Sequence, residues 1–376
     1  MFALKEGDMK ILVPVLTFSR SGGARVLSEM ASRWVGSGSK VVFYAHISSD
    51  LQYFPTQAEV VWYDNLGNLR SEKPEADGKT RKSGLLLQVI GLWLALMKRE
   101  SWVYDVVLAN HSMTAWPVTM SSRKNRKKYY YIQAYEPEFY ESLPGVKACI
   151  LKWLSEKSYN FKLTQICNAP IYLNYKKIRA KQWVPPGLDF NVYFPKVEQK
   201  DLVGTSEIIL GCIGRKEAAK GTEFVLEAFK ILHKIDERFV LHVAYGNLPD
   251  GWAHPGLKIV VPRNDSELAE FYRSLDIIIA PGTVQHGAPH YPVMEGMACG
   301  IPVVTTGYMP ADETNAWIVN NKDTNAIVDA VLSIIGNHED VRLRVRRALE
   351  SISVFGWEVV SSKMLKCFTL ADGQGE

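Results

Sequence analysis

Residues 208–221 read Ile-Ile-Leu-Gly-Cys-Ile-Gly-Arg-Lys-Glu-Ala-Ala-Lys-Gly, and residues 291–304 read Tyr-Pro-Val-Met-Glu-Gly-Met-Ala-Cys-Gly-Ile-Pro-Val-Val. The first stretch is an apolar strand that ends in a turn before a helix. The second begins as a helix and ends in a buried strand. Strands that alternate with helices in this way are typical of a parallel sheet covered by helices on both faces.

The same alternation extends outward from these stretches over the whole chain. Buried strands are expected at residues 10–16, 40–45, 60–63, 105–109, 128–133, 208–213, 239–245, 258–261, 277–280 and 302–305. Helices are expected at residues 24–35, 85–97, 222–235, 266–274, 325–335, 341–353 and 357–368. Residues 67–83 are polar and contain Gly and Pro, which predicts a mobile surface loop.

The length predicts two domains, because 376 residues exceed one typical domain and 47% of them are apolar. Pro185-Pro186-Gly187 and the polar residues 196–206 interrupt the alternation. We therefore predict an α/β protein of two Rossmann-like doubly wound domains, 1–190 and 191–354, that face a central cleft. Residues 355–376 should form a helix that crosses back to the first domain. Ligands of such sheets bind beyond the carboxyl ends of the strands.

Charge and cysteine usage exclude several classes of protein. The net charge of +4 is too small to argue for nucleic-acid binding. The five cysteines are scattered, odd in number and without a Cys-x-x-Cys pair, so neither a disulfide framework nor a zinc site is expected. The N-terminus has no signal-peptide pattern. A cytoplasmic protein without metal or cofactor is the expectation.

Arg215 and Lys220 lie just past the first of the two quoted strands, which ends at Gly214. Glycine lets a backbone approach a ligand closely, Arg can grip phosphate oxygens with its fork, and Lys is a mobile point charge. The two cations could therefore neutralise a diphosphate. The alternative is two solvated cations at a helix start.

The second quoted stretch supplies a helix start and a carboxylate. Pro292 suits the first turn of a helix, and the amides there, near Val293 and Met294, favour an anion. Glu295 could accept hydrogen bonds from a ribose diol, or it could simply complement the helix dipole. Just upstream, His286 and His290 have no carboxylate at metal-ligand spacing, so we expect them to contact substrate rather than a metal.

In the first half, Gly22, Gly23 and Arg25 lie between the first strand and the first helix. The glycine pair would let the backbone wrap around a ligand, although a plain tight turn is the alternative. The stretch lacks the Gly-x-Gly-x-x-Gly spacing, and the chain has no Gly-x-x-x-x-Gly-Lys-Ser/Thr loop, so a nicotinamide cofactor is disfavoured.

Two further strand ends in the first half carry polar side chains. His111 follows the strand 105–109 and could hydrogen-bond a sugar hydroxyl or hold a proton, although a lone histidine is often structural. Gln133, Tyr135 and Glu136 follow the strand 128–133. An aromatic face and hydrogen-bonding groups there suit a sugar, whereas core tyrosines at a strand end are the alternative.

The apolar helix 85–97 is too short to span a bilayer. We interpret it as a buried core helix. Docking on a membrane surface is the alternative, because Lys98, Arg99 and the basic residues 123–128 are near in sequence.

Taken together, these segments resemble the GT-B-fold glycosyltransferases, and most closely the large retaining family four, over nearly the whole chain. Five blocks carry the resemblance in the family's order: Gly22-Gly23; Pro186-Gly187-Leu188-Asp189 with Phe194-Pro195; Gly214-Arg215 through Lys220-Gly221; residues 292–304; and Phe355-Gly356-Trp357-Glu358. The His-containing loop at 286–292 and residues 131–137 resemble a bacterial subgroup that includes rhamnosyltransferases of surface polysaccharides.

The resemblance implies a metal-independent transfer of a sugar from a nucleotide diphosphate-sugar to a glycan or lipid-linked glycan. Together with the residue patterns above, it places the donor on Gly214, Arg215, Lys220, His290, Val293, Met294 and Glu295, and the acceptor on Gly22, Gly23, Arg25, Gln133, Tyr135 and Glu136. It makes Arg215 and Lys220 stabilise the leaving diphosphate, with His111 near the reacting face. A free cytoplasmic protein and one attached peripherally to the inner face of the plasma membrane both fit.

One departure from the family's pattern is present. The family carries a first Glu eight positions before the one matched by Glu295, and here that position is Gly287. Two other kinds of protein stay open, and the missing Glu favours only the first of them. One is a nucleotide-sugar-binding protein without transferase activity. The other is a different enzyme on a similar fold, namely a nucleotide-sugar epimerase or a phosphorylase with a lysine-bound pyridoxal cofactor.

Overall fold

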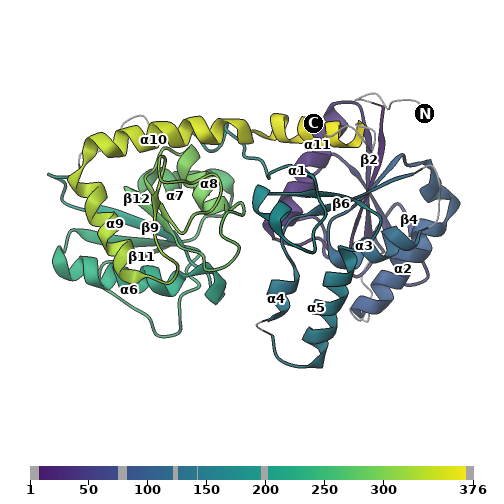
Figure 1. The fold of residues 1–376 in the computed structure, drawn as a ribbon, viewed down its shortest axis with the longest axis horizontal. Coiled ribbons are helices and arrows are strands. Elements are labelled where there is room, and N and C mark those ends of the chain that lie inside the picture. The colour runs from purple at the N-terminus through teal and green to yellow at the C-terminus, as the bar shows by residue number, and fades with distance from the viewer. Residues whose placement is uncertain (1–7, 75–82, 122–125, 142, 196–201, 370–376) are drawn as a thin grey trace. The chain divides into compact units, whose positions relative to one another are not determined.

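The computed structural model of the protein describes residues 8–74, 83–121, 126–141, 143–195 and 202–369. The chain divides into two compact units (Figure 1). Unit 1 comprises Met1–Gly187 and Trp357–Glu376, and unit 2 comprises Leu188–Gly356. The chain therefore passes between the units at 187/188 and at 356/357, whereas the sequence placed these borders at 190/191 and 354/355.

Unit 1 is built on a sheet with the strand order β4-β3-β2-β1-β5-β6-β7-β8. The strands are β1 (Lys10–Val15), β2 (Lys40–His46), β3 (Glu59–Tyr63), β4 (Leu69–Arg70), β5 (Val106–Ala109), β6 (Lys127–Ile132), β7 (Thr164–Cys167) and β8 (Gln182–Trp183). Neighbouring strands run parallel, except that β4 pairs antiparallel with β3. The central strands are buried along almost their whole length, as expected of a sheet covered on both faces.

Helices cover both faces of this sheet. They are α1 (Gly22–Gly36), α2 (Leu85–Met97), α3 (Ser112–Met120), α4 (Pro137–Glu141), α5 (Val146–Ser158) and α11 (Trp357–Thr369), with short 3-10 turns η1 (Arg99–Val103) and η2 (Pro170–Asn174). Helix α11 packs on α1, and α3 packs against both α2 and α5. Figure 1 shows α2, α3 and α5 on one side of the sheet and α1 and α11 on the other.

Unit 2 repeats the architecture with the strand order β11-β10-β9-β12-β13-β14, all parallel. Its strands are β9 (Ile208–Ile213), β10 (Phe239–Ala244), β11 (Leu257–Val260), β12 (Ile277–Ala280), β13 (Val303–Thr305) and β14 (Trp317–Ile318). Its helices are α6 (Thr222–Ile235), α7 (Asp265–Ser274), α8 (Tyr291–Ala298), α9 (Thr324–Gly336) and α10 (His338–Ile352), with the 3-10 turns η3 (Ala218–Lys220) and η4 (Ser353–Phe355).

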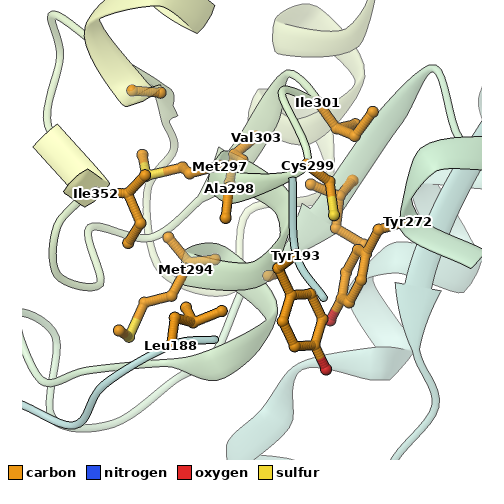
Figure 2. Packing of buried hydrophobic residues seen from close by; sticks show 14 of the residues in the cluster. Leu188, Tyr193, Tyr272, Met294, Met297, Ala298, Cys299, Ile301, Val303 and Ile352 are labelled. Atoms are coloured by element: carbon orange, nitrogen blue, oxygen red, sulfur yellow. The ribbon is translucent and has the colours of Figure 1, made fainter. Parts of the chain in front are cut away.

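Two hydrophobic clusters hold unit 2 together, one on each face of its sheet. Helix α6 and helix α9 contribute to the first cluster, together with β9 and β10. Helices α7 and α8 contribute to the second (Figure 2). Figure 2 shows Met294, Met297 and Ala298 of α8 within this second cluster, to which Tyr193 and Tyr272 also belong. The short α8 is thus fixed by burial rather than by its length.

Several segments differ from what the sequence predicts. Within the predicted loop 67–83, Leu69–Arg70 form the edge strand β4, and residues 75–82 lie outside the described residues. Residues 196–201 of the predicted boundary segment and residues 122–125 of the basic cluster also lie outside the described residues. Helix α2 is not a buried core helix, because Leu86, Leu87 and Ile90 are exposed on its outer face.

The C-terminal helix α11 is an integral part of unit 1. The indole N–H of Trp34 in α1 donates to the carbonyl oxygen of Ser361 at 3.1 Å, and the ring of Trp34 packs edge-on against Phe368. The ammonium of Lys363 lies 3.9 Å from the ring centroid of Trp183. Aromatic contacts and a buried hydrogen bond therefore join the last helix to the first.

Candidate functional site

The loop that follows β9 requires a glycine at its first position. A Cβ on Gly214 would lie 1.6 Å from the carbonyl oxygen of Gly246, so no side chain fits there. The N–H of Gly214 donates to Ala244 at 2.9 Å, and the side-chain amide of Asn247 donates to its carbonyl at 3.2 Å. The close packing of the β9 and β10 ends therefore delivers Arg215 directly beyond the strand.

Arg215 and Lys220 are both exposed, and the turn η3 brings them together. The N–H of Arg215 donates to the hydroxyl of Thr222 at 3.2 Å, which anchors the loop to the start of α6. Loss of hydration at Lys220 lowers its pKa, and the nearby charge of Arg215 lowers it as well. The two cations thus lie close enough to repel one another, an arrangement that an anion would relieve.

Contacts between two loops bring the two halves of the candidate site together. The N–H of Thr283, in the loop after β12, donates to the carbonyl of Ala219 at 2.9 Å. Gly221 has φ +69°, and a Cβ there would lie 2.0 Å from the carbonyl oxygen of Pro281. The loops after β9 and β12 therefore touch backbone to backbone, although their sequences are far apart.

His290 faces the same pair of cations. It directly precedes α8, and its ring lies 4.7 Å from that of Tyr308. Burial of the ring, together with the charges of Lys220 and Arg215, lowers the pKa of His290 to about 3. Its buried Nδ1 has no hydrogen-bond partner among the described residues. Two cations and one neutral imidazole thus converge at the carboxyl ends of β9 and β12.

The structure corrects the role expected for Val293 and Met294. Their N–H groups donate to the carbonyl of His290 at 3.0 and 3.1 Å. Both side chains are fully buried in the core beneath α8. Because the amides are used inside the helix and the side chains are enclosed, neither residue is open to a ligand in this structure.

Glu295 occupies the α8 position that the sequence predicted, but its surroundings were not foreseen. The residue is only 3% exposed, and its Oε2 accepts a hydrogen bond of 2.8 Å from the hydroxyl of Tyr272 in α7. Burial raises the pKa of Tyr272 well above its usual value, and the carboxylate raises it further. Tyr272 is therefore a protonated donor that fixes the orientation of Glu295.

Gly287, eight positions before Glu295, has a distinct backbone. Gly287 has φ +88°, in the left-handed region that favours glycine, and its N–H donates to the carbonyl of Gly307 at 2.8 Å. The hydroxyl of Tyr308 donates to the carbonyl of Val284 in the same loop. The conformation of this loop thus suits a glycine at position 287.

In unit 1, the structure brings His111 and Glu136 together. His111 precedes α3, and its Nδ1 accepts the N–H of Met113 at 3.0 Å. Its Nε2 lies 3.4 Å from Oε2 of Glu136. Since Nδ1 is an acceptor, Nε2 carries the hydrogen and faces the carboxylate. The side chain of His111 is 41% exposed. Because both ring nitrogens are engaged, the part of the ring that is open to solvent is its carbon edge.

Glu136 is itself buried and serves as a hub of hydrogen bonds. Its Oε1 accepts the N–H of Ser112 at 2.8 Å and the hydroxyl of Tyr130 at 3.3 Å, and its Oε2 accepts the hydroxyl of Ser112. The carboxylate that the sequence assigned to an acceptor is therefore occupied by α3, β6 and His111. It orients its neighbours rather than lining an open surface.

The other acceptor residues expected in unit 1 are placed as follows. Gly22 and Gly23 belong to the first turn of α1, and a Cβ on Gly23 would lie 3.2 Å from the side-chain oxygen of Gln133. Gly23 thus lets the amide of Gln133 approach the helix start. Arg25 is buried, so its side chain is not available to an acceptor on the surface.

Tyr135 lies within a column of stacked tyrosines. Its ring centroid is 5.5 Å from that of Tyr159 and 4.8 Å from that of Tyr175, with interplanar angles of 19° and 23°. Tyr130 stacks on Tyr159 and Tyr172 on Tyr175, which extends the column in both directions. With a ring neighbour on each side, Tyr135 can offer a sugar its hydroxyl and edge, but not a free face.

Sequence reasoning missed three positioning residues. Thr222, Tyr272 and Ser112 each hold a predicted residue by a hydrogen bond. Thr222 has a signal, because it follows Gly221 at a helix start where a hydroxyl often meets a backbone N–H. Tyr272 and Ser112 have none, since only the folded chain brings them to their partners.

Other features of the described residues lie apart from this site. A groove of about 890 Å³ in unit 2 is lined by residues of β10, β11 and α7, such as His242, Lys258 and Phe271. Arg215, Lys220 and His290 do not line this groove. Within the described ranges, no group of three or more His, Cys, Asp or Glu side chains could hold a metal ion. No helix among these residues is long and apolar enough to cross a membrane.

Comparisons with known proteins agree with this architecture. Residues 207–337 match the family described as "Glycosyl transferases group 1". A D-inositol 3-phosphate glycosyltransferase of Corynebacterium glutamicum (strain R) is 23% identical over 209 residues, which are 48% of this chain and 49% of that protein. The chain thus spans about half the length of the curated relative that it matches.

Solved structures of similar fold cover almost the whole chain. Sucrose-phosphate synthase from Thermosynechococcus elongatus superposes with a TM-score of 0.73 at 15% identity, over 96% of this chain and 98% of that one. Anabaena HepE in complex with UDP and glucose gives 0.68 at 14% identity, over 96% and 99%. TarM gives 0.70 at 11% identity, over 96% and 98%. The protein therefore has the two-domain GT-B architecture, and the family match in unit 2 supports a glycosyltransferase.

Proposed function

We propose that this protein is a retaining hexosyltransferase that moves a sugar from a nucleotide diphosphate-sugar to a glycan or lipid-linked glycan of a surface polysaccharide. The observation that carries the proposal is the convergence of Arg215, Lys220 and His290 where the loops after β9 and β12 meet. Supporting it, Anabaena HepE, of the same architecture, is solved with UDP-glucose.

The chemistry needed from these residues is electrostatic. When the bond between sugar and diphosphate breaks, negative charge grows on the leaving phosphate oxygens. Arg215 and Lys220 would stabilise that charge, and because their attraction for it grows as the charge grows, the stabilisation is greatest when the diphosphate leaves. His290, neutral at physiological pH, offers a nitrogen without adding a third charge before the donor binds.

The proposal assigns Glu295 to the donor's ribose. Its carboxylate is held by Tyr272, and the residue is only 3% exposed. In unit 1 we propose that Gln133, the hydroxyl of Tyr135 and the exposed edge of His111 contact the acceptor or the transferred sugar. Glu136 acts on that contact indirectly, by holding His111. Attachment at the inner face of the plasma membrane is part of the same proposal.

The decisive experiment pairs nucleotide binding with turnover. Thermal shifts with UDP, GDP, ADP and dTDP should identify one base, since a ligand that binds the folded state raises the melting temperature. Arg215→Ala and Lys220→Ala should each lower sugar transfer by about 100-fold. Both side chains are exposed, so the melting temperature without nucleotide should be unchanged.

Lys216→Ala is the matched control, because Lys216 lies in the same loop but pairs with Asp250 at 3.5 Å. It should keep wild-type turnover. Nucleotide binding without transfer or donor hydrolysis would favour a binding protein, the alternative suggested by Gly287. Interconversion of sugar nucleotides without acceptor would favour an epimerase. Full activity in both cation variants would exclude the proposed mechanism.

A further inference from the structure

Two histidine rings are in contact in unit 2. His233 lies in the last turn of α6, and His254 lies in the loop 245–256 between β10 and β11. Their ring centroids are 4.6 Å apart, and the ring planes meet at 88°. Phe229 packs edge-on against His254 at 4.8 Å, and Trp252 stacks beside it at 6.4 Å. The two imidazoles thus belong to one aromatic cluster.

The hydrogen bonds of the two rings show where each carries its hydrogen. Nδ1 of His233 lies 2.8 Å from the carbonyl oxygen of Phe239, and because a carbonyl can only accept, this Nδ1 carries a hydrogen. Nδ1 of His254 accepts the N–H of Gly256 at 3.2 Å, so it carries none. A proton added to His254 would go to this same Nδ1 and would face the N–H of Gly256. Protonation of His254 is therefore incompatible with that bond.

The turn at His254 joins the loop to the edge strand β11. The carbonyl of His254 accepts the N–H of Leu257 at 3.0 Å, and the carbonyl of Gly256 accepts the N–H of Leu241 in β10 at 2.8 Å. A Cβ on Gly256 would lie 3.3 Å from Nδ1 of His233. The backbone of the turn thus lies directly against the histidine pair, and a change in either ring reaches it.

Nearby charge also opposes protonation of His254. Burial lowers its pKa, and the charges of His233 and Lys230, both in α6, lower it further. Asp236, which follows α6, is already engaged by Arg238 at 2.7 Å. The surroundings of His254 therefore favour its neutral ring.

The other end of the same loop supports the candidate donor site. The carbonyl of Gly246 leaves room only for a glycine at position 214, and the side-chain amide of Asn247 donates to the carbonyl of Gly214. Further along the loop, Asp250 pairs with Lys216 at 3.5 Å. This loop therefore connects the histidine pair with the loop after β9.

We propose that His233 and His254 form an acid-sensitive latch, which holds the loop 245–256 closed near neutral pH and releases it in acid. A proton on His254 removes the bond to Gly256 and places a cation against the ring of His233. Because the open loop binds this proton more readily than the closed loop, opening increases as the pH falls below 6.5, the ordinary value for histidine. The increase is up to about tenfold per pH unit. Above pH 6.5 the latch stays closed.

Hydrogen exchange measured by mass spectrometry tests the latch in the full chain. Between pH 8 and pH 5, after correction for the intrinsic exchange rate, peptides that cover residues 245–257 should lose protection in the wild type. His254→Asn should keep its protection over this range, because an Asn side chain can accept the same N–H in an Asx-turn and does not titrate. Equal loss of protection in the two proteins would overturn the proposal.

His338→Asn is the matched control, since His338 lies at the start of α10 in the same unit. This variant should lose protection over 245–257 as the wild type does, and protection that stays constant in the control would overturn the proposal. A second measurement needs no variant. Imidazole NMR of the wild type should give His254 a pKa below 6.5, with the hydrogen on Nε2 at neutral pH. A pKa of 6.5 or higher would also overturn the latch.

The latch is tested apart from the proposed function, because the exchange experiment needs neither nucleotide nor sugar. Lys220→Ala should keep the acid-induced opening even though it loses transfer. Only the effect on the donor site rests on the proposed function: nucleotide affinity should fall between pH 8 and pH 5 more in the wild type than in His254→Asn. Equal falls would overturn that coupling. Acid-induced opening in a protein that binds no nucleotide would support the latch and contradict the proposed function.

Discussion

A single carboxylate organises the candidate residues of unit 1. Glu136 holds Ser112, Tyr130 and the Nε2 side of His111, and His111 in turn accepts the N–H of Met113, the second residue of α3. The orientation of the imidazole is therefore determined from two sides. Glu136, which the sequence analysis assigned to acceptor binding, is therefore better described as a residue that positions His111.

Replacing Glu136 tests this role. Glu136→Gln should destabilise the protein by about 1–3 kcal/mol, because the amide cannot accept from every donor that now faces the carboxylate. It should lower kcat more than it raises KM for the donor, since His111 loses its fixed orientation. Urea unfolding and transfer kinetics measure the two effects.

The control for this variant is Glu138→Gln. Glu138 lies in the same segment as Glu136, and its side chain accepts a hydrogen bond from the hydroxyl of Tyr175. It should leave both quantities near their wild-type values. If Glu136→Gln lost stability but kept wild-type kcat, Glu136 would have a structural role only.

His290 makes a second prediction at the scale of one residue. Its pKa is about 3 in the folded protein, against 6.5 in an exposed histidine. Between these values the unfolded chain binds a proton that the folded chain does not. Stability is therefore complete above pH 6.5 and is lost as the pH falls, with a slope of up to about 1.4 kcal/mol per pH unit from this residue.

The measurement is urea unfolding of the wild type and of His290→Asn between pH 8 and pH 4. The variant should lose less stability over this range than the wild type. Parallel curves would show that the imidazole is accessible to protons in the folded state. A nearby diphosphate should raise the pKa of His290, so saturating nucleotide should reduce the difference between the two curves.

At the scale of elements, the candidate site depends on contact between two loops. Gly221 starts α6 at φ +69° and lies against the carbonyl of Pro281, and the Thr283–Ala219 hydrogen bond completes the contact. A larger residue at position 221 would separate the loops. The group formed by Arg215, Lys220 and His290 would then be lost without any change to its own members.

Gly221→Ala should destabilise the protein by about 1–2 kcal/mol, from the left-handed backbone alone, and weaken nucleotide binding in addition. Gly336→Ala is the control, since a Cβ at that helical position meets nothing within 4 Å. That variant should be neutral, or stabilised by up to about 1 kcal/mol. Wild-type nucleotide affinity in Gly221→Ala would show that the loop contact is not needed for the site.

The elements also show what sequence patterns can and cannot reveal. The strands β9 and β12 and the helix α6 were predicted with their observed bounds, because their apolar runs and spacing are regular. Helices α3, α4 and α5 were not predicted. α5 buries small polar residues and exposes apolar ones, so its pattern does not point inward, and α3 contains Pro117.

For the site, sequence indicated Gly214, Arg215, Lys220 and His290, which the fold brings together. It could not indicate that the Val293 and Met294 amides are used by His290, or that Tyr272 reaches Glu295. Hydrogen-bond partners distant in sequence are decided by the packing of whole helices, and a single sequence contains no local trace of them.

At the scale of the whole molecule, the chain connects its two units through paired segments. The N–H of Leu188 donates to the carbonyl of Phe355 at 2.8 Å, and Leu188 forms a parallel bridge with Gly356. Directly beside this pair, a Cβ on Gly187 would lie 2.4 Å from the indole of Trp357, the first residue of α11. The two connections are thus packed against one another rather than independent.

Gly187→Ala should displace Trp357 and loosen α11 from α1. We expect faster limited proteolysis near the C-terminus and a lower melting temperature, with the first sheet otherwise intact. Gly204→Ala is the control, because its Cβ would meet nothing within 4 Å. Wild-type protease resistance in Gly187→Ala would show that the indole can move aside without cost to the helix.

The positive φ of Gly287 limits what can be engineered into this loop. An acidic side chain introduced at position 287 would occupy a backbone conformation that disfavours every residue with a Cβ. Installing a carboxylate there would therefore require remodelling of the surrounding segment as well as the single substitution.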